Sequence, residues 1–498
     1  MRVLLTLPVV LPLLAAGLSM ALHRKPRAQR TLGVAVLVVV LAATVVLLAR
    51  VHDDGPAAVQ AGAWPAPIGI TLVADLFAAI MLVVSAAMLL AVLVYAIGSP
   101  RTTDHALFFH PVYLILAAGV SASFLAGDLF NLFVAFEVML SASYVLMTLG
   151  GNRDQVRSGM TYVVISLVAS TLFVTAVGLI YAATGTVNMA DLASRIADLP
   201  DAVRTGLGLL LLVVFGVKAA ILPLFFWLPD SYPTAPTPVT AIFAGLLTKV
   251  GVYAIIRTQT LLFPTDGDPS LLLLAIAGAT MVVGVLGAIA QNDVKRILSF
   301  HIVSQIGYMV MGLGLFSVAG MAGAIFYIVH HIVVKTTLFL VGGLVENATG
   351  TGALHRLGGL LHRAPLMAVL FILPALSLAG LPPFSGFVAK LALVQAGLEI
   401  DRYLIVGVSL AVSLLTLFSM TKIWAGVFWG TPQEDPPKLA ARGHGRLSAP
   451  PLMVVPTAAL VVLGLVVALA GAPLYDLSSQ AAVTLTDPAP YIQVVMGG

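Results

Sequence analysis

Several charged side chains lie inside long apolar runs of this sequence, and these ionisable groups are the first candidates for a chemical role. One acid, Glu137, lies in the middle of such a run, and five lysines do the same, namely Lys218, Lys249, Lys335, Lys390 and Lys422. A charge at the centre of a bilayer costs at least about 2.5–3.5 kcal/mol. Glu137, Lys218 and Lys249 fall at similar depths in their runs. These residue types at matching depths indicate groups that take up and release protons.

Glu137 and Lys218 have two interpretations. One is a structural ion pair that holds two helices together, but buried pairs contribute little net stability. The other is a proton switch, since ionisable groups inside membrane spans usually mark ion paths. A low-dielectric site disfavours the charged form of a lysine, and a nearby carboxylate favours it. Opening and closing a contact between the two side chains would then release and recapture a proton, and we favour this interpretation.

A second group of polar residues lies near Lys335. His331 and Lys335 are four residues apart and so share one helical face, with His330 beside them. We expect protons to pass between such groups at this position, and Lys422 is a further candidate. A packing role for one of the two histidines stays open, and Lys422 lies close enough to the end of its run to extend to the membrane surface instead.

Prolines interrupt the apolar runs beside two of the lysines. Pro223 follows Lys218 by five residues, and Pro382 and Pro383 precede Lys390 by about two helical turns. Proline removes a backbone donor and so weakens a helix. Broken helices at mid-membrane are tolerated where the freed backbone lines a hydrated cavity, and they are frequent at the ion sites of transporters. A simple packing kink is the alternative at either position.

We expect membrane-spanning helices to carry these residues. The chain has 498 residues, of which 60% are hydrophobic and 9% charged, whereas soluble domains average roughly 25% charged residues. We therefore expect an all-α polytopic membrane protein. The apolar runs predict about fourteen spans, near 2–22, 31–50, 70–97, 107–126, 128–149, 160–182, 205–228, 237–259, 271–290, 297–316, 320–345, 365–399, 403–429 and 452–471.

The predicted spans divide into two blocks of five, residues 107–259 and 271–429, between an N-terminal segment 1–106 and a last segment 430–498. Because five is odd, the second block enters the membrane from the opposite face, as in an inverted transporter repeat. The two spans that prolines interrupt are the seventh, 205–228, and the twelfth, 365–399. They take corresponding places in the two blocks. Basic residues gather in the connections after odd-numbered spans, so the positive-inside rule places both chain ends on the outer side of the cell membrane.

Composition also excludes several classes of function. The chain contains no cysteine, which excludes disulfides, zinc–thiolate sites and iron–sulfur clusters bound by this chain. The adjacent histidines diverge by about 100° and have no carboxylate nearby in their run. We therefore expect no metal and no cofactor. The net charge of +4 follows from the basic connections, so nucleic acid is not an expected partner.

Four stretches of the sequence resemble the proton-translocating subunits shared by respiratory complex I and Mrp-type cation/proton antiporters. They are residues 128–138, 218–250, 293–310 and 381–391, which occur in family order within residues 70–430. The resemblance implies a fold of fourteen helices with two inverted five-helix repeats. It also implies a proton relay that consists of Glu137, Lys218, Lys249, His330, Lys335 and, as its terminal lysine, Lys390.

The lysine at position 390 resembles both the D-type of Mrp subunits and the N-type of complex I, whereas the chain length and the segment 474–498 are most similar to the D-type. This implies a proton-translocating subunit of a Na+/H+ antiporter, which is a secondary transporter and not an enzyme. Its implied partners are the small Mrp subunits, the larger antiporter-like A-type subunit, protons, Na+ and the lipid bilayer. The alternatives are an N-type subunit of complex I (NADH:quinone oxidoreductase) or of a membrane-bound hydrogenase, and a non-transporting scaffold subunit.

Overall fold

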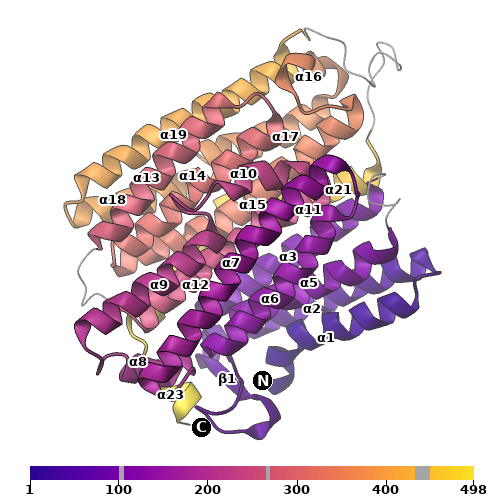
Figure 1. The fold of residues 1–498 in the computed structure, drawn as a ribbon. Helices are drawn as coiled ribbons and strands as arrows, with labels where there is room; N and C mark the ends of the chain where they lie inside the picture. Colours follow the sequence, from indigo (N-terminus) through magenta and orange to yellow (C-terminus); the bar gives the residue numbers. More distant parts are fainter. Residues whose placement is uncertain (100–105, 265–269, 432–448, 498) are drawn as a thin grey trace.

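The fold is a bundle of membrane-length α-helices with one small two-stranded sheet (Figure 1). The computed structural model describes residues 1–99, 106–264, 270–431 and 449–497. Basic residues of the predicted connections at 101, 438, 442 and 446 lie outside the described residues. Within the described residues, thirteen helical segments are long and apolar enough to cross a membrane. They are α1 (Arg2–Ala21), α2 (Pro26–Asp54), α3 (Leu76–Gly98), α5 (Ala106–Leu125), α6 (Leu129–Thr148), α7 (Arg153–Thr184), α9 (Asp201–Ala219), α11 to α12 (Thr237–Leu261), α13 (Leu271–Ala290), α14 (Val294–Gly314), α15 (Val318–Thr349), α19 with its last turn η5 (Tyr403–Trp429) and α21 (Pro451–Leu469).

The remaining predicted span, 365–399, is present as two shorter helices, α17 (Pro365–Ala379) and α18 (Ser385–Glu399). Pro382 and Pro383 lie between them, as the sequence predicts. The span 205–228 is also broken, because α9 ends at Ala219 and helix resumes only in the short α10 (Trp227–Ser231). The prediction of an all-α membrane protein with two broken helices is confirmed.

Shorter elements lie between the spans or after them. They are β1 (Ala57–Gln60), which pairs antiparallel with β2 (Thr71–Ala74), and η1 (Ala61–Ala63), α8 (Met189–Arg195), η2 (Tyr232–Thr234), η4 (Leu354–Arg356), α16 (Leu360–Arg363), α22 (Gly471–Thr486) and α23 (Ala489–Met496). The span from α11 to α12 contains a π-helical segment, η3 (Phe243–Leu247), and η5 (Ala425–Trp429) is also π-helical. Such π-helical segments occur frequently at functional sites.

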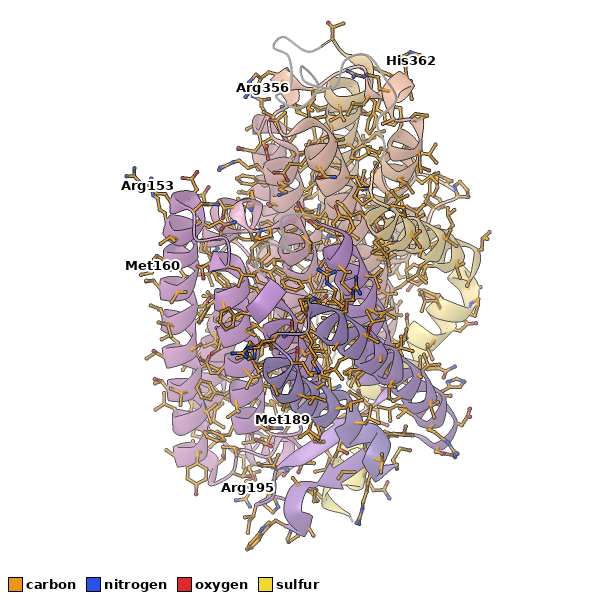
Figure 2. The ribbon with its side chains drawn as sticks, turned by 90° about the vertical axis from the view of Figure 1, so that its right-hand side faces the viewer. Arg153, Met160, Met189, Arg195, Arg356 and His362 are labelled. Atoms are coloured by element: carbon orange, nitrogen blue, oxygen red, sulfur yellow. The ribbon has the colours of Figure 1, made fainter. Side chains whose placement is uncertain are left out.

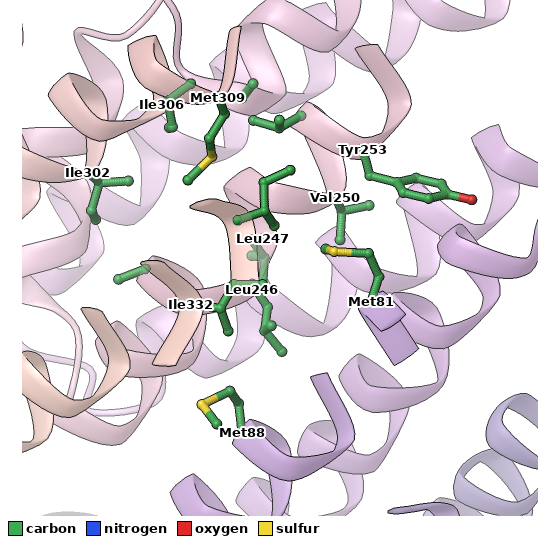
Figure 3. Close-up of a cluster of buried hydrophobic side chains, with 14 of the residues drawn as sticks. Met81, Met88, Leu246, Leu247, Val250, Tyr253, Ile302, Ile306, Met309 and Ile332 are labelled. Carbon is green, nitrogen blue, oxygen red and sulfur yellow. The ribbon is translucent and has the colours of Figure 1, made fainter. Parts of the chain in front are cut away.

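The centre of the bundle is formed by helices that are buried on all sides. The apolar stretches of α11 to α12 and of α15 are wholly buried, which is expected of helices that are apolar all round. Figure 3 shows where they meet α3 and α14, with Met81, Leu247, Val250, Ile306 and Ile332 among the side chains in contact. The lysines of α12 and α15 therefore lie in the interior and not at the lipid surface.

A repeated connection supports the inverted arrangement. In the first block an antiparallel bridge joins Asp128, before α6, to Asn188, after α7. In the second block the corresponding bridge joins Asp293, before α14, to Ala353, after α15. In Figure 2, Met189 lies toward the lower end of the molecule and Arg356 lies at the upper end. The same local structure thus occurs at opposite ends, as inverted repeats require. Both chain ends lie at one end of the bundle (Figure 1), which agrees with an even number of crossings.

Candidate functional site

Glu137 and Lys218 are joined through a third side chain, Ser170 of α7. The Ser170 hydroxyl donates to Glu137 Oε1 and accepts a hydrogen bond from Lys218 Nζ at 3.1 Å. Lys218 Nζ also donates to the carbonyl of Ser166 at 3.2 Å. In the part of the chain that the structure describes, Glu137 and Lys218 form no direct ion pair within 4.0 Å. The expected direct contact is thus replaced by a serine bridge.

The break after α9 determines the surroundings of Lys218. Lys218 lies in the last turn of α9, where the carbonyl end of the helix dipole favours a cation. Trp227 of α10 packs back onto the break, and its Nε1 donates to the carbonyl of Val217 at 3.1 Å. A cavity of about 10 Å³ is lined by Lys218, Ser166 and Trp227. This volume is close to the size that holds one water molecule.

Lys249 is the second residue after the π-helical segment η3. Its Nζ donates to the carbonyl of Ala244 at 2.6 Å and to Thr248 Oγ1 at 3.2 Å. A Cβ at Gly245 would lie 2.3 Å from Thr336 Oγ1 of α15. Because glycine occupies this position, α15 approaches η3 closely next to Lys335. The two spans that carry the buried lysines Lys249 and Lys335 therefore pack against each other at the level of the lysines.

The polar groups of α15 divide into bonded and unbonded ones. His330 Nδ1 is hydrogen-bonded to Ser385 Oγ of α18 at 2.9 Å, and Ser385 contacts Ser377 Oγ at 3.2 Å. Both ring nitrogens of His331 and the Nζ of Lys335 have no hydrogen-bond partner among the described protein atoms. Buried polar groups normally bond to protein or to internal water. The orphaned groups of His331 and Lys335 therefore indicate a hydrated interior beside α15.

Lys390 of α18 turns back onto the end of α17. Its Nζ donates to the carbonyls of Leu378 and Ala379 and to Ser413 Oγ, each at 3.0 Å. The ammonium also lies 5.1 Å from the centre of the Tyr308 ring, a distance at which the ring face attracts a cation. The predicted helix break thus adjoins Lys390 and supplies two of its acceptors.

Lys422 has different surroundings from the other buried lysines. Its Nζ donates to the carbonyls of Ile289 and Gln291 at 2.9 and 2.7 Å, and these residues form the end of α13. A lysine at the last carbonyls of a helix stabilises that helix. This geometry favours a capping role for Lys422.

Among the described residues, no group of three or more His, Asp or Glu side chains is placed to hold a metal ion.

A buried ion pair lies outside the set that the sequence predicted. Arg257 of α12 and Asp75, the residue before α3, form two contacts of 2.7 Å, and both side chains are buried. The guanidinium also lies 5.2 Å from the ring centre of Tyr491 in α23. Arg257 lies near the end of the predicted span 237–259, where a long basic side chain can extend to the membrane surface. The pair joins residues 182 positions apart, a contact for which a single sequence carries no signal.

We expect Arg257→Met to destabilise the folded chain strongly, because it leaves the Asp75 carboxylate buried without its partner, at a cost of about 3–5 kcal/mol. The double variant Asp75→Asn with Arg257→Met should recover most of that loss. Arg50→Met is the matched control, since the Arg50–Asp54 contact of 3.9 Å is exposed at both side chains. The stability of the two single variants and of the double variant is measured by thermal unfolding of the detergent-extracted protein. Equal effects of Arg257→Met and Arg50→Met would contradict the expectation.

Several known proteins are similar to this chain in sequence and in fold. The family described as NADH:quinone oxidoreductase/Mrp antiporter, TM, matches residues 126–416. The chain is 45% identical to the D subunit of the Na(+)/H(+) antiporter of Alkalihalophilus pseudofirmus over the full length of both chains. In structure it is similar to a chain of the Mrp complex from Dietzia sp. DQ12-45-1b, with a TM-score of 0.91, 37% identity and full coverage of both chains.

A chain of the archaeal membrane-bound sulfane sulfur reductase is also similar. The TM-score is 0.90 at 26% identity, over 99% of this chain and 100% of that one. This fold therefore occurs in a respiratory complex as well as in antiporters, and the higher sequence identity lies with the antiporter relatives.

Proposed function

This chain belongs to the NADH:quinone oxidoreductase/Mrp antiporter family of membrane subunits, and we propose that it is the proton-translocating subunit of a multisubunit Na+/H+ antiporter. As a multi-pass subunit of a cation/proton antiporter complex, it works together with other subunits. In this proposal the partners are the small Mrp subunits together with the larger antiporter-like one, and both chain ends face the outside of the cell membrane. We further propose that residues 107–259 and 271–429 are the two repeats, between segments 1–106 and 430–498.

One observation carries the proposal. Lys218 and Lys390 each lie at a break in a membrane helix, and Lys249 lies beside a π-helical segment. Each ammonium is held by carbonyl or hydroxyl oxygens. Neutral acceptors of this kind accommodate both protonation states of a lysine, whereas direct contact with a carboxylate favours the charged state. A series of such lysines through one membrane protein is suited to carry protons, because each of them can change its charge without the loss of an ionic partner.

The proposed path begins at Glu137 and ends at Lys390. Glu137 acts on Lys218 through Ser170, so a small shift of α6 or α7 would change how strongly the carboxylate favours the charged lysine. From Lys218 the proton passes to Lys249, then to Lys335 and the histidines of α15, and then to Lys390. The unbonded nitrogens of His331 and Lys335 would be reached through water. The membrane potential contributes about 2.3 kcal/mol per charge per 100 mV, which is enough to bias such a switch.

The similarity to a respiratory complex supports a second candidate function. In that case the same proton path serves an N-type subunit of complex I or of a hydrogenase-like complex, and the chain is part of an enzyme. Neighbouring genes distinguish the two functions. Genes for small Mrp subunits next to this one favour the antiporter, and genes for flavin or iron–sulfur subunits favour the respiratory complex.

We expect the purified chain alone to give no Na+-dependent proton flux in proteoliposomes, while the whole complex does. The reason is that Glu137 and the lysines described above form the proposed proton path, and the described residues contain no group of three or more His, Asp or Glu side chains placed to hold a metal ion. Flux is measured with a pH-sensitive dye after a pulse of Na+, and empty liposomes are the control. Robust exchange by the single chain would contradict the proposal that partner subunits provide the cation path.

A further inference from the structure

A second cluster of polar residues lies at one end of the two spans that carry Lys249 and Lys335. Lys295 Nζ of α14 forms an ion pair with Glu346 Oε2 at 2.7 Å, and Thr237 Oγ1 donates to the same oxygen at 3.3 Å. Thr237 begins α11, and Glu346 lies three residues before the end of α15. The Glu346 side chain is 20% exposed and that of Lys295 is 10% exposed. The carboxylate therefore lies between the interior and the surface.

Glu346 and Lys335 lie on the same face of α15. They are eleven residues apart, which corresponds to three turns or about 16 Å. Between the two residues in the chain, Gly343 makes room for two polar side chains, because a Cβ there would lie 2.2 Å from Thr237 Cγ2 and 2.5 Å from the Tyr95 hydroxyl. The Tyr95 hydroxyl donates to the carbonyl of Leu340 at 3.0 Å. Hydroxyl groups thus continue from the carboxylate toward the lysine.

Two polar atoms without partners lie near the inner end of this stretch of α15. Lys335 Nζ and the neighbouring Thr336 Oγ1 are wholly buried and have no hydrogen-bond partner among the atoms that the structure describes. Buried groups of this kind usually bond to internal water. A half-buried carboxylate, two intervening hydroxyls and an unbonded lysine therefore follow one another along α15, from the surface to the centre.

We infer that Glu346 is the carboxylate through which protons enter or leave the Lys249–Lys335 centre, at the end of the bundle where Figure 2 shows Arg356. This inference rests on the proposed function. A proton from solution binds the carboxylate and weakens its pairing with Lys295. The proton then moves inward to the neutral Lys335 amine, which becomes an ammonium, and Glu346 is again a carboxylate paired with Lys295. The alternative is that Lys295 and Glu346 only hold α14 and α15 together.

The test compares two neighbouring ion pairs of α14 in the whole complex. Glu346→Gln keeps the shape of the side chain but removes the proton-binding group, so we expect Na+-dependent proton flux to fall at least tenfold. Glu346→Asp restores a carboxylate and should restore most of the flux. Asp230→Asn is the matched control, because Asp230 pairs at 3.1 Å with Arg296, the residue after Lys295, and both side chains are exposed. Its flux should stay within about twofold of the unmodified complex.

A double variant separates transport from packing. Lys295→Gln with Glu346→Gln leaves no unpaired charge and should assemble normally, as judged on native gels, while its flux stays low. Normal flux in this variant would overturn the inference and assign the pair to packing. Lys335→Ala tests the underlying proposal separately. Normal flux in Lys335→Ala would refute the relay itself, whereas an inactive Lys335→Ala beside a fully active Glu346→Gln would refute only the entry role of Glu346.

Discussion

Replacement of Lys390 with alanine is expected to abolish Na+-dependent proton flux while the complex still assembles. Lys390 Nζ contacts two carbonyls and one hydroxyl, and no carboxylate contacts it among the described residues. Its loss therefore leaves no buried charge without a partner, and the break between α17 and α18 depends on Pro382 and Pro383. Transport stops because the path loses its terminal proton carrier. Flux in membrane vesicles measures transport, and native gels measure assembly.

Lys422→Ala is the matched control for this prediction. Lys422 also donates to two carbonyls at the end of a helix, but the proposed path does not include it. We expect Lys422→Ala to keep its flux and to lose at most about 1 kcal/mol of stability through the weakened end of α13. If Lys390→Ala fails to assemble while Lys422→Ala assembles, Lys390 has a structural role.

The broken helices could be predicted from the sequence because their causes are local. A proline removes a donor from its own helix, so Pro223, Pro382 and Pro383 mark the interruptions without knowledge of the fold. The apolar runs likewise give the spans, because a bilayer requires a minimum length of apolar helix. The buried lysines could also be identified from the sequence, because a charge within an apolar span is costly whatever the span packs against.

Contacts between distant helices could not be predicted in this way. Ser170 is one of several serines on an apolar helix, and only the packing of α6, α7 and α9 places it between Glu137 and Lys218. Glu346 lies just beyond the end of the predicted span 320–345, as many surface acids do, and its proposed role depends on Thr237, more than a hundred positions away. A periodic pattern shows which residues share one helix face, but it does not show which face of another helix lies opposite.

Glu137→Gln is expected to stop proton transport with little change in the yield of folded complex. Glutamine keeps the shape of the side chain and an oxygen that can accept the Ser170 hydroxyl, but it removes the charge that favours protonated Lys218. Ser170→Ala is the companion variant, because it removes the bridge and leaves both ionisable groups. We expect Ser170→Ala to reduce flux severalfold without abolishing it. Na+-dependent proton flux and the yield of extracted complex are measured for each variant.

A structural role for Glu137 and Lys218 predicts a different pattern. If the two residues only hold helices together, Glu137→Ala should sharply reduce the yield of complex, because an unpaired buried charge costs about 3–5 kcal/mol. The exchange of both residues, Glu137→Lys with Lys218→Glu, should then restore yield and transport together. In a proton switch the exchange restores yield but leaves transport inactive, since the lysine that hands its proton to Lys249 is then on α6 instead of α9. Near-normal flux in Glu137→Gln would refute the switch, because the carboxylate would then be dispensable.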